Sequence, residues 1–281
     1  MKLRVVSILM FVFLCSAYSQ EDAPLPNGWQ HSLVGGLNLT QVGLNDWAPG
    51  GEEALSWAIT GEGKSANKQT KTDWTTNYKL AFGQTKLGNQ AVRKTDDKID
   101  VETIFTYIMG VYVNPYVAAT LKTQFAKGYE FNDTGGRTEV SKFFDPGYLT
   151  QSVGLGYEPV PQVKTRFGLA VREIMTSEFT HFSDDPETDD IEKTKVDGGL
   201  ESVTDVKWQL KENVLLTSKL ELFSAFSNFT DAVVRSDSTL AIKVGKYVTV
   251  NFNTQIVSDT TASPKVQVKE TLSLGLSYTL F

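Results

Sequence analysis

The sequence predicts an all-β fold, a transmembrane antiparallel up-and-down β-barrel of about twelve strands preceded by a cleaved signal peptide. Three observations predict it. Apolar residues recur at every second position through most of the chain, which is the period of a strand with one apolar face. Most of these runs reach the roughly 9 to 11 residues that a tilted strand needs to cross a bilayer. Short turns and long, charged loops also alternate along the chain, which is typical of outer-membrane barrels.

The N-terminus predicts export. The segment "VVSILMFVFLCSAYS" follows Lys2 and Arg4 and ends in small residues near Ser19, as a signal peptide does. It is shorter than the roughly 20 apolar residues of a spanning helix. We therefore expect residues 1–19 to be a signal peptide, 20–28 a short linker and 29–281 the barrel. An alternative is a lipoprotein acylated on Cys15, but Leu14 is a poor residue for the preceding position.

The closing segment "LSLGLSYTLF" has Leu272, Leu274, Leu276 and Leu280 on one face and small residues on the other. Comparable runs predict strands at about 29–44, 54–63, 71–84, 99–113, 116–131, 147–158, 162–177, 197–211, 214–229, 237–244, 247–258 and 266–281. A pair of packed sheets would alternate too. The length of the runs and their connections favour the barrel.

The connections predict which ends of the strands meet. Tight turns are expected at Asn114-Pro115, 158–161, 212–213 and 245–246, with a somewhat longer link at 65–70. Long loops are expected at 45–53, 85–98, 132–146 and 177–195. If the first strand rises from the periplasm, the tight turns and both termini lie on the periplasmic side. Closure follows from the membrane, because an unpaired sheet edge in hydrocarbon costs several kcal/mol per backbone group.

Composition limits the function. The chain has 281 residues, 21% of them charged, and a net charge of -6, with a mean hydropathy of -0.20. Polar residues facing a lumen explain this low hydropathy in a membrane protein. The acidic balance gives no basic patch for nucleic acid. The single cysteine, Cys15, lies in the expected signal peptide, so no disulfide is expected.

The last residues carry a second targeting signal. Ser273, Gly275, Tyr278, Leu280 and Phe281 resemble the C-terminal β-signal that the barrel assembly machinery reads. The resemblance implies insertion into outer-membrane lipid, with that machinery and periplasmic chaperones as partners during biogenesis. The sequence does not identify an envelope protein that the mature barrel would bind.

A broader resemblance covers the mature chain. The segments "WQHSLVGGLNLTQVGLNDWAPGGEEALSW", "AVRKTDDKIDVE", "TLKTQFAKGYEF" and "FFDPGYLTQSVGLGYEP" occur in this order. They resemble the outer-membrane β-barrel family of Bacteroidetes-type bacteria catalogued as domain of unknown function 3078. The resemblance implies an outer-membrane location. It gives no established activity and no catalytic residues.

Catalytic and metal sites receive little support. His181 and Ser183 have the spacing of the outer-membrane phospholipase pair, but they lie in an acidic loop where an orienting partner is not expected. The acidic residues of 184–192 lack the glycine-punctuated pattern of an EF-hand. His31 has no spaced second histidine for zinc. We expect no enzyme, no cofactor and no metal site.

The alternation places charges of both signs inside the barrel, where water or partners must satisfy them. The candidate pore-lining residues are Lys79, Glu102, Lys122, Lys164, Arg166, Arg172, Lys207, Lys219, Glu221 and Lys243. Either they pair across a narrow barrel and close it, or they line a wet channel. A barrel of about twelve strands lies between filled and open sizes. The first hypothesis is passage of small solutes, the second a structural or interaction barrel, and the third a lipid-active enzyme.

Overall fold

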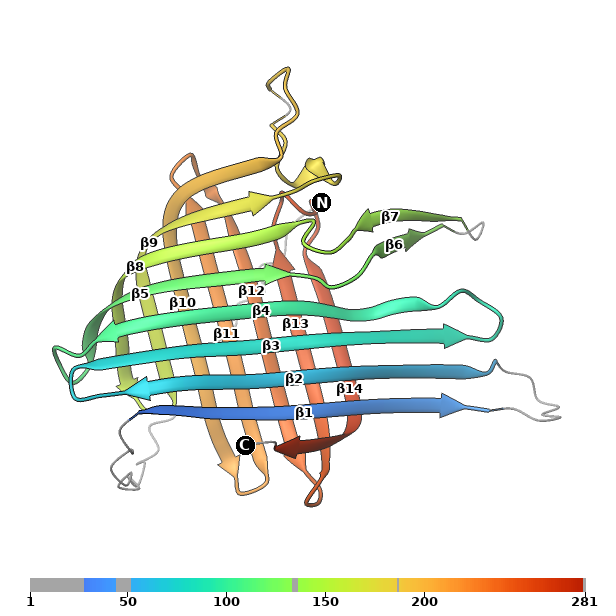
Figure 1. The fold of residues 1–281 in the computed structure, drawn as a ribbon, viewed down its shortest axis with the longest axis horizontal. Coiled ribbons are helices and arrows are strands. Elements are labelled where there is room, and N and C mark those ends of the chain that lie inside the picture. The colour runs from blue at the N-terminus through green and yellow to red at the C-terminus, as the bar shows by residue number, and fades with distance from the viewer. Residues whose placement is uncertain (1–27, 44–51, 133–135, 186, 280–281) are drawn as a thin grey trace, which may run out of the picture.

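The structure of the protein, a computed structural model, describes residues 28–43, 52–132, 136–185 and 187–279. Twelve of its strands close into one antiparallel barrel, and two more form a hairpin outside it (Figure 1). Among these residues, no helix has the length and apolarity needed to cross a bilayer. The expected signal peptide and linker, residues 1–27, lie outside the described residues.

The barrel strands alternate in direction, and the set extends from Trp29 to Thr279. They are β1 (Trp29–Val42), β2 (Ala54–Lys68), β3 (Thr72–Leu87), β4 (Arg93–Tyr107), β5 (Val113–Thr123), β8 (Gly147–Val160), β9 (Val163–Met175), β10 (Thr194–Lys211), β11 (Val214–Ala225), β12 (Asn228–Lys243), β13 (Val248–Ser258) and β14 (Gln267–Thr279). The hairpin consists of β6 (Gly128–Phe131) and β7 (Arg137–Ser141). A short 3-10 helix, η1 (Thr180–Phe182), lies between β9 and β10.

The last strand closes the ring against the first. The order around the barrel is β1-β14-β13-β12-β11-β10-β9-β8-β5-β4-β3-β2. β14 pairs with β1 from Val34↔Thr279 to Asn38↔Gly275. This confirms the predicted closed barrel of about twelve strands.

The outer face of the barrel is apolar and exposed. Leu39, Ile59, Leu169 and Leu272 are among the outward side chains that contact no protein neighbour over most of their surface. Such an exterior would be unstable in water and suits hydrocarbon. It also explains why so few apolar side chains are buried in the barrel.

Aromatic residues gather on this outer face near one end. Trp74 packs edge-on against both Trp29 and Phe105, with ring centroids 5.5 and 6.2 Å away. Trp29 and Trp74 lie on the exposed outer face, and Trp208 is exposed to the same extent. Trp57 packs against Phe82, and Trp47 lies outside the described residues.

The two ends of the barrel differ in their connections. We call one the short-turn end, where residues 69–71, 108–112, 161–162, 212–213 and 244–247 link the strands, and the other the long-loop end. The predicted alternation holds with two exceptions. At the long-loop end, 88–92 and 226–227 are also short, because β3 ends later and β4 and β12 begin earlier than predicted. Asn114-Pro115 was predicted as a turn but lies at the start of β5, just after the actual link at 108–112.

The predicted strand 116–131 is wrong in its second half. β5 ends at Thr123, and residues 128–131 pair with β7 outside the barrel. The chain leaves the barrel because Asp97 of β4 accepts hydrogen bonds from the backbone N–H groups of Phe125 and Ala126. The hairpin therefore projects from the long-loop end (Figure 1).

The predicted strand 237–244 is too short. β12 begins at Asn228, so the segment expected to be a loop pairs with β11 and β13. Val233 and Val234 are adjacent and Ser236 follows, so this segment lacks the apolar alternation that predicted the other strands. The correction places Arg235 inside the barrel.

Candidate functional site in the lumen

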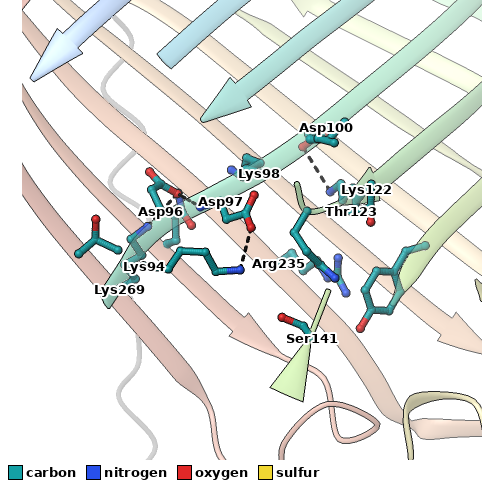
Figure 2. Close-up of a pocket in the computed structure, with 15 residues that line it drawn as sticks. Lys94, Asp96, Asp97, Lys98, Asp100, Lys122, Thr123, Ser141, Arg235 and Lys269 are labelled. Atoms are coloured by element: carbon teal, nitrogen blue, oxygen red, sulfur yellow. Dashed lines mark hydrogen bonds and ion pairs between the residues drawn. The ribbon is translucent and has the colours of Figure 1, made fainter. Parts of the chain in front are cut away.

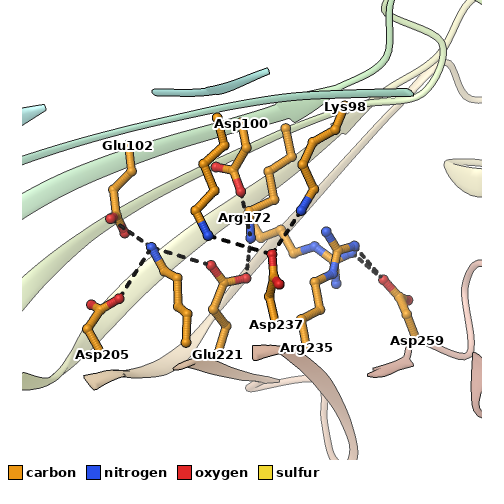
Figure 3. Close-up of polar contacts among 12 residues, drawn as sticks. Lys98, Asp100, Glu102, Arg172, Asp205, Glu221, Arg235, Asp237 and Asp259 are labelled. Atoms are coloured by element: carbon orange, nitrogen blue, oxygen red, sulfur yellow. Dashed lines mark hydrogen bonds and ion pairs between the residues drawn. The ribbon is translucent and has the colours of Figure 1, made fainter. Parts of the chain in front are cut away.

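Charged side chains from seven strands meet inside the barrel. We call ten of them the lumen belt: Lys79, Lys98, Asp100, Glu102, Lys122, Arg166, Asp205, Lys219, Glu221 and Asp237. Strand alternation turns these positions inward, while the apolar residues between them face outward. Figure 3 shows side chains from facing walls pointing toward one another.

Glu102 is the most buried member of the belt, at 2% exposure. It accepts a hydrogen bond from Arg166 of β9, and Lys219 of β11 lies 2.7 Å from its second oxygen. Asn77 of β3 donates to the same carboxylate at 3.3 Å. Two cations and an amide thus compensate one buried carboxylate, as burial of a charge requires.

A second carboxylate continues this network. Glu221 accepts a hydrogen bond from Lys122, and Lys219 lies 3.8 Å from it. Lys122 also lies 3.9 Å from Asp100. Lys219 therefore links the pairs around Glu102 and Glu221 into one group.

A third group joins opposite walls. Lys98 of β4 donates to Asp237 of β12 at 3.0 Å, and these strands are six places apart in the ring of twelve. Lys79 of β3 lies 3.6 Å from the same carboxylate. Asn253 donates to it at 2.7 Å. Since this contact spans the diameter of the ring, the belt crosses the lumen.

Two arginines lie nearer the long-loop end. Arg172 and Arg235 lie 2.6 and 3.1 Å from one oxygen of Asp259, in the β13–β14 loop. Both guanidinium groups also lie near the ring of Tyr148, at 5.4 and 4.8 Å. Burial acts to raise the pKa of Asp259, but the two arginines outweigh burial and hold that pKa below its usual range.

A cavity of about 420 Å³ opens beside the belt at the long-loop end, and we call it the vestibule. Figure 2 shows its charged lining, which includes belt residues Lys98, Asp100 and Lys122. Lys94 donates to Asp97 at 2.7 Å, and Lys269 of β14 lies 3.1 Å from Asp96. Five basic side chains and three carboxylates line the vestibule, and two of these carboxylates, Asp97 and Asp96, form the ion pairs just given.

The predicted lumen residues divide into two sets. Lys79, Glu102, Lys122, Arg166, Lys219 and Glu221 lie in the belt, and Arg172 joins Asp259 beside it. Lys164, Lys207 and Lys243 lie instead near the short-turn end and are exposed. Lys164 is 3.0 Å from Glu158 there.

Sequence reasoning missed several partners. Within "RKTDDK", Lys94 pairs with Asp97. Lys98 and Asp96 pair instead with Asp237 and Lys269 from other strands, which the sequence does not indicate. Arg235 was missed because its segment was predicted as a loop. The available signal was the spacing of two between Arg235 and Asp237, which puts both on one face once the strand is extended.

The assembly-signal residues lie on the closing strand. Ser273 and Gly275 belong to β14, and Tyr278 pairs with Gly35 through the backbone. A Cβ at Gly275 would overlap the side chain of Asn38, so the seam needs a small residue there. Leu280 and Phe281 lie outside the described residues.

Ser183 and His181, the residues of the catalytic alternative, make structural contacts with other neighbours. Ser183 is buried, and its hydroxyl bonds to Thr176 and donates to the carbonyl of Glu192 at 2.6 and 2.8 Å. His181 packs on Phe182 instead of orienting the hydroxyl. His31 bonds Ser65 at 2.8 Å. Within the described ranges, no three His, Cys, Asp or Glu side chains gather as metal ligands.

Strand closure, the apolar exterior and the charged interior together define the class: a transmembrane β-barrel. Residues 39–129 match the family described as Protein of unknown function (DUF3078). The match confirms the family resemblance over that segment. The quoted segment "FFDPGYLTQSVGLGYEP" lies beyond it. No curated protein matches the sequence.

Solved structures with similar folds include several membrane proteins. The translocator domain of the autotransporter NalP from Neisseria meningitidis is 13% identical, covering 90% of this chain and 89% of that one, with a TM-score of 0.37. The COG4313 outer membrane channel from Pseudomonas putida F1 is 10% identical, with 94% and 99% coverage and a TM-score of 0.39. The Pseudomonas putida toluene transporter TodX is 9% identical, with 91% and 90% coverage and a TM-score of 0.34. At these TM-scores, the architecture rests on the strand pairing of this chain itself.

Proposed function

We propose that this protein is a barrel of the bacterial outer membrane that passes small polar solutes, with the lumen belt as its gate. One observation carries the proposal: the belt crosses the lumen and adjoins a charged cavity at the long-loop end. Its members are mostly long, flexible side chains, and Lys79, Lys98 and Lys122 keep 21 to 38% of their side-chain surface exposed. Rotation of such side chains can open a path without moving the strands.

The proposed location follows from the exterior and the two targeting signals. An apolar outer face suits lipid, residues 1–19 would direct export, and the closing strand would be read by the barrel assembly machinery with periplasmic chaperones. The short-turn end would then face the periplasm. The proposal includes no enzymatic activity, cofactor, metal or nucleic acid.

A second candidate function is presentation of an interaction surface. The β6–β7 hairpin projects from the long-loop end (Figure 1) and is stiffened by stacking of Arg137 over Tyr129 and Arg93 over Phe131, at 4.7 and 4.6 Å. A barrel whose belt never opens would fit this role with an envelope partner.

Conductance separates the two functions. The Asp237→Asn variant removes the carboxylate that holds Lys98 and Lys79 across the lumen. In planar bilayers we expect the natural protein to open rarely, and the variant to open more often or more widely. Glu212→Gln, in an exposed turn at the short-turn end, is the matched control and should leave the openings unchanged.

Liposome swelling with small sugars gives the second measurement. Folding of the natural protein and of Asp237→Asn is checked by the change in gel migration that heating causes in a folded barrel. If both proteins are folded and neither admits solute, the proposal of solute passage is wrong. The interaction function would then remain.

A further inference from the structure

The β4–β5 turn, residues 108–112, has an unusual composition for a turn at the end of a barrel. It reads Ile108-Met109-Gly110-Val111-Tyr112 and contains no charged or amide side chain. Met109, Val111 and Tyr112 are 74, 83 and 58% exposed. Each of the other four turns at the short-turn end carries a charged or amide side chain, namely Lys71, Gln162, Glu212 and Lys246. Adjacent exposed apolar residues are unfavourable in water and mark a contact surface.

The apolar surface of this turn is continuous with the outer wall of the barrel. Phe105 and Tyr107 precede it on β4, and Val113 follows on β5, all of them exposed on the outer face. Tyr157 of β8, which pairs with Val113, extends the same surface sideways. No charged side chain interrupts the sequence from Ile104 to Val113. The turn thus extends the surface that contacts lipid.

Several backbone groups of the turn are hydrogen-bonded within the protein, as an apolar environment requires. The side-chain oxygen of Asn114 accepts hydrogen bonds from the N–H groups of Met109 and Gly110, at 2.7 and 2.9 Å. The N–H of Ile108 donates to the carbonyl of Lys71 at 2.8 Å, and the carbonyl of Tyr112 accepts from Glu158 at 2.9 Å. In lipid, backbone groups must be satisfied inside the protein because no water is present. These four bonds satisfy three of the five N–H groups of the turn and the carbonyl of Tyr112.

We propose that the β4–β5 turn is a membrane anchor that inserts into the lipid leaflet at the short-turn end. The occupant of this surface is lipid because the turn continues the lipid-facing wall. The inserted turn would set how deeply the barrel wall at β4 and β5 sits in the bilayer, while the polar turns at the same end stay in water. Its function is independent of solute passage.

Depth-dependent fluorescence tests the proposal. Cys15 is the only cysteine, so a Cys15→Ser background permits single labels at Met109→Cys and Val111→Cys. Gln162→Cys, in the β8–β9 turn, is the matched control. The folded variants are reconstituted in phospholipid vesicles with an environment-sensitive dye. A quencher on the lipid chains reports insertion, and aqueous iodide reports exposure to water.

We expect blue-shifted emission and quenching from lipid at positions 109 and 111, at a depth of about 5–10 Å into the headgroup and acyl boundary. Position 162 should be quenched by iodide instead. The proposal is overturned if all three positions respond equally to iodide. It is also overturned if 109 and 111 are accessible in pure lipid but shielded in native membranes, which would indicate a protein partner. Band shift on heating confirms that each variant is folded.

Discussion

Lysines of the lumen occupy two different environments. Lys219, in the belt, keeps 15% of its side chain exposed and lies within 4.0 Å of Glu102, Asp205 and Glu221. Lys164, at the short-turn rim, keeps 52% exposed and lies near Glu158 alone among the ion pairs found in the described residues. Both face the lumen by the same alternation. Depth along the barrel therefore decides whether a charge is part of a network or is solvated.

The difference has an energetic consequence. A buried charge that loses its partner keeps its desolvation penalty, whereas an exposed one regains water. Substitutions in the belt should therefore affect stability and gating together. Substitutions at the rim should affect neither by much.

The largest effect is expected for Glu102→Gln. This variant leaves Arg166 and Lys219 without their shared carboxylate in a site that water hardly reaches. Breaking a buried pair costs about 3–5 kcal/mol. Urea unfolding of the refolded barrel in lipid–detergent bilayers would measure the loss. Adding Lys219→Met should recover part of it, because the two positions are coupled. A loss below about 1 kcal/mol would mean that water enters the belt.

An intermediate effect is expected at Asp259, between the belt and the outside. Its pKa is lowered in the folded protein because Arg172 and Arg235 outweigh its burial. A lowered folded pKa gives stability that is present above the unfolded value of about 3.9 and is lost as pH falls through the folded pKa. Removing the carboxylate with Asp259→Asn should cost about 1.5–3 kcal/mol at neutral pH.

The pH dependence supplies the control for this variant. Below about pH 4 the natural protein should lose stability more steeply than Asp259→Asn, since the variant has no carboxylate to protonate there. Unfolding midpoints measured in urea from neutral to acidic pH compare the two. Parallel curves would contradict the assigned role of Asp259.

The same comparison shows what could be predicted from the sequence. Alternation predicted the strands and their faces, because side-chain direction depends only on position along a strand. Closure was predicted from the cost of an unpaired sheet edge in hydrocarbon. It could not predict that Lys98 meets Asp237, because contacts across a barrel depend on strand tilt and stagger. It also missed the end of β5, which is set by hydrogen bonds that the backbone N–H groups of Phe125 and Ala126 donate to Asp97 on another strand. Depth and cross-lumen contacts are three-dimensional properties, so the ten predicted residues could not be divided into belt and rim.

The smallest effect is expected at the rim, for Glu158→Gln. The variant removes the partner of Lys164, but both side chains are about half exposed. Exposed pairs contribute about 0–1 kcal/mol, and salt screens them further. We expect the unfolding free energy to change within that range, and added salt to erase the change. A loss comparable to that of Glu102→Gln would place Lys164 functionally in the belt, and the division of the lumen by depth would be wrong.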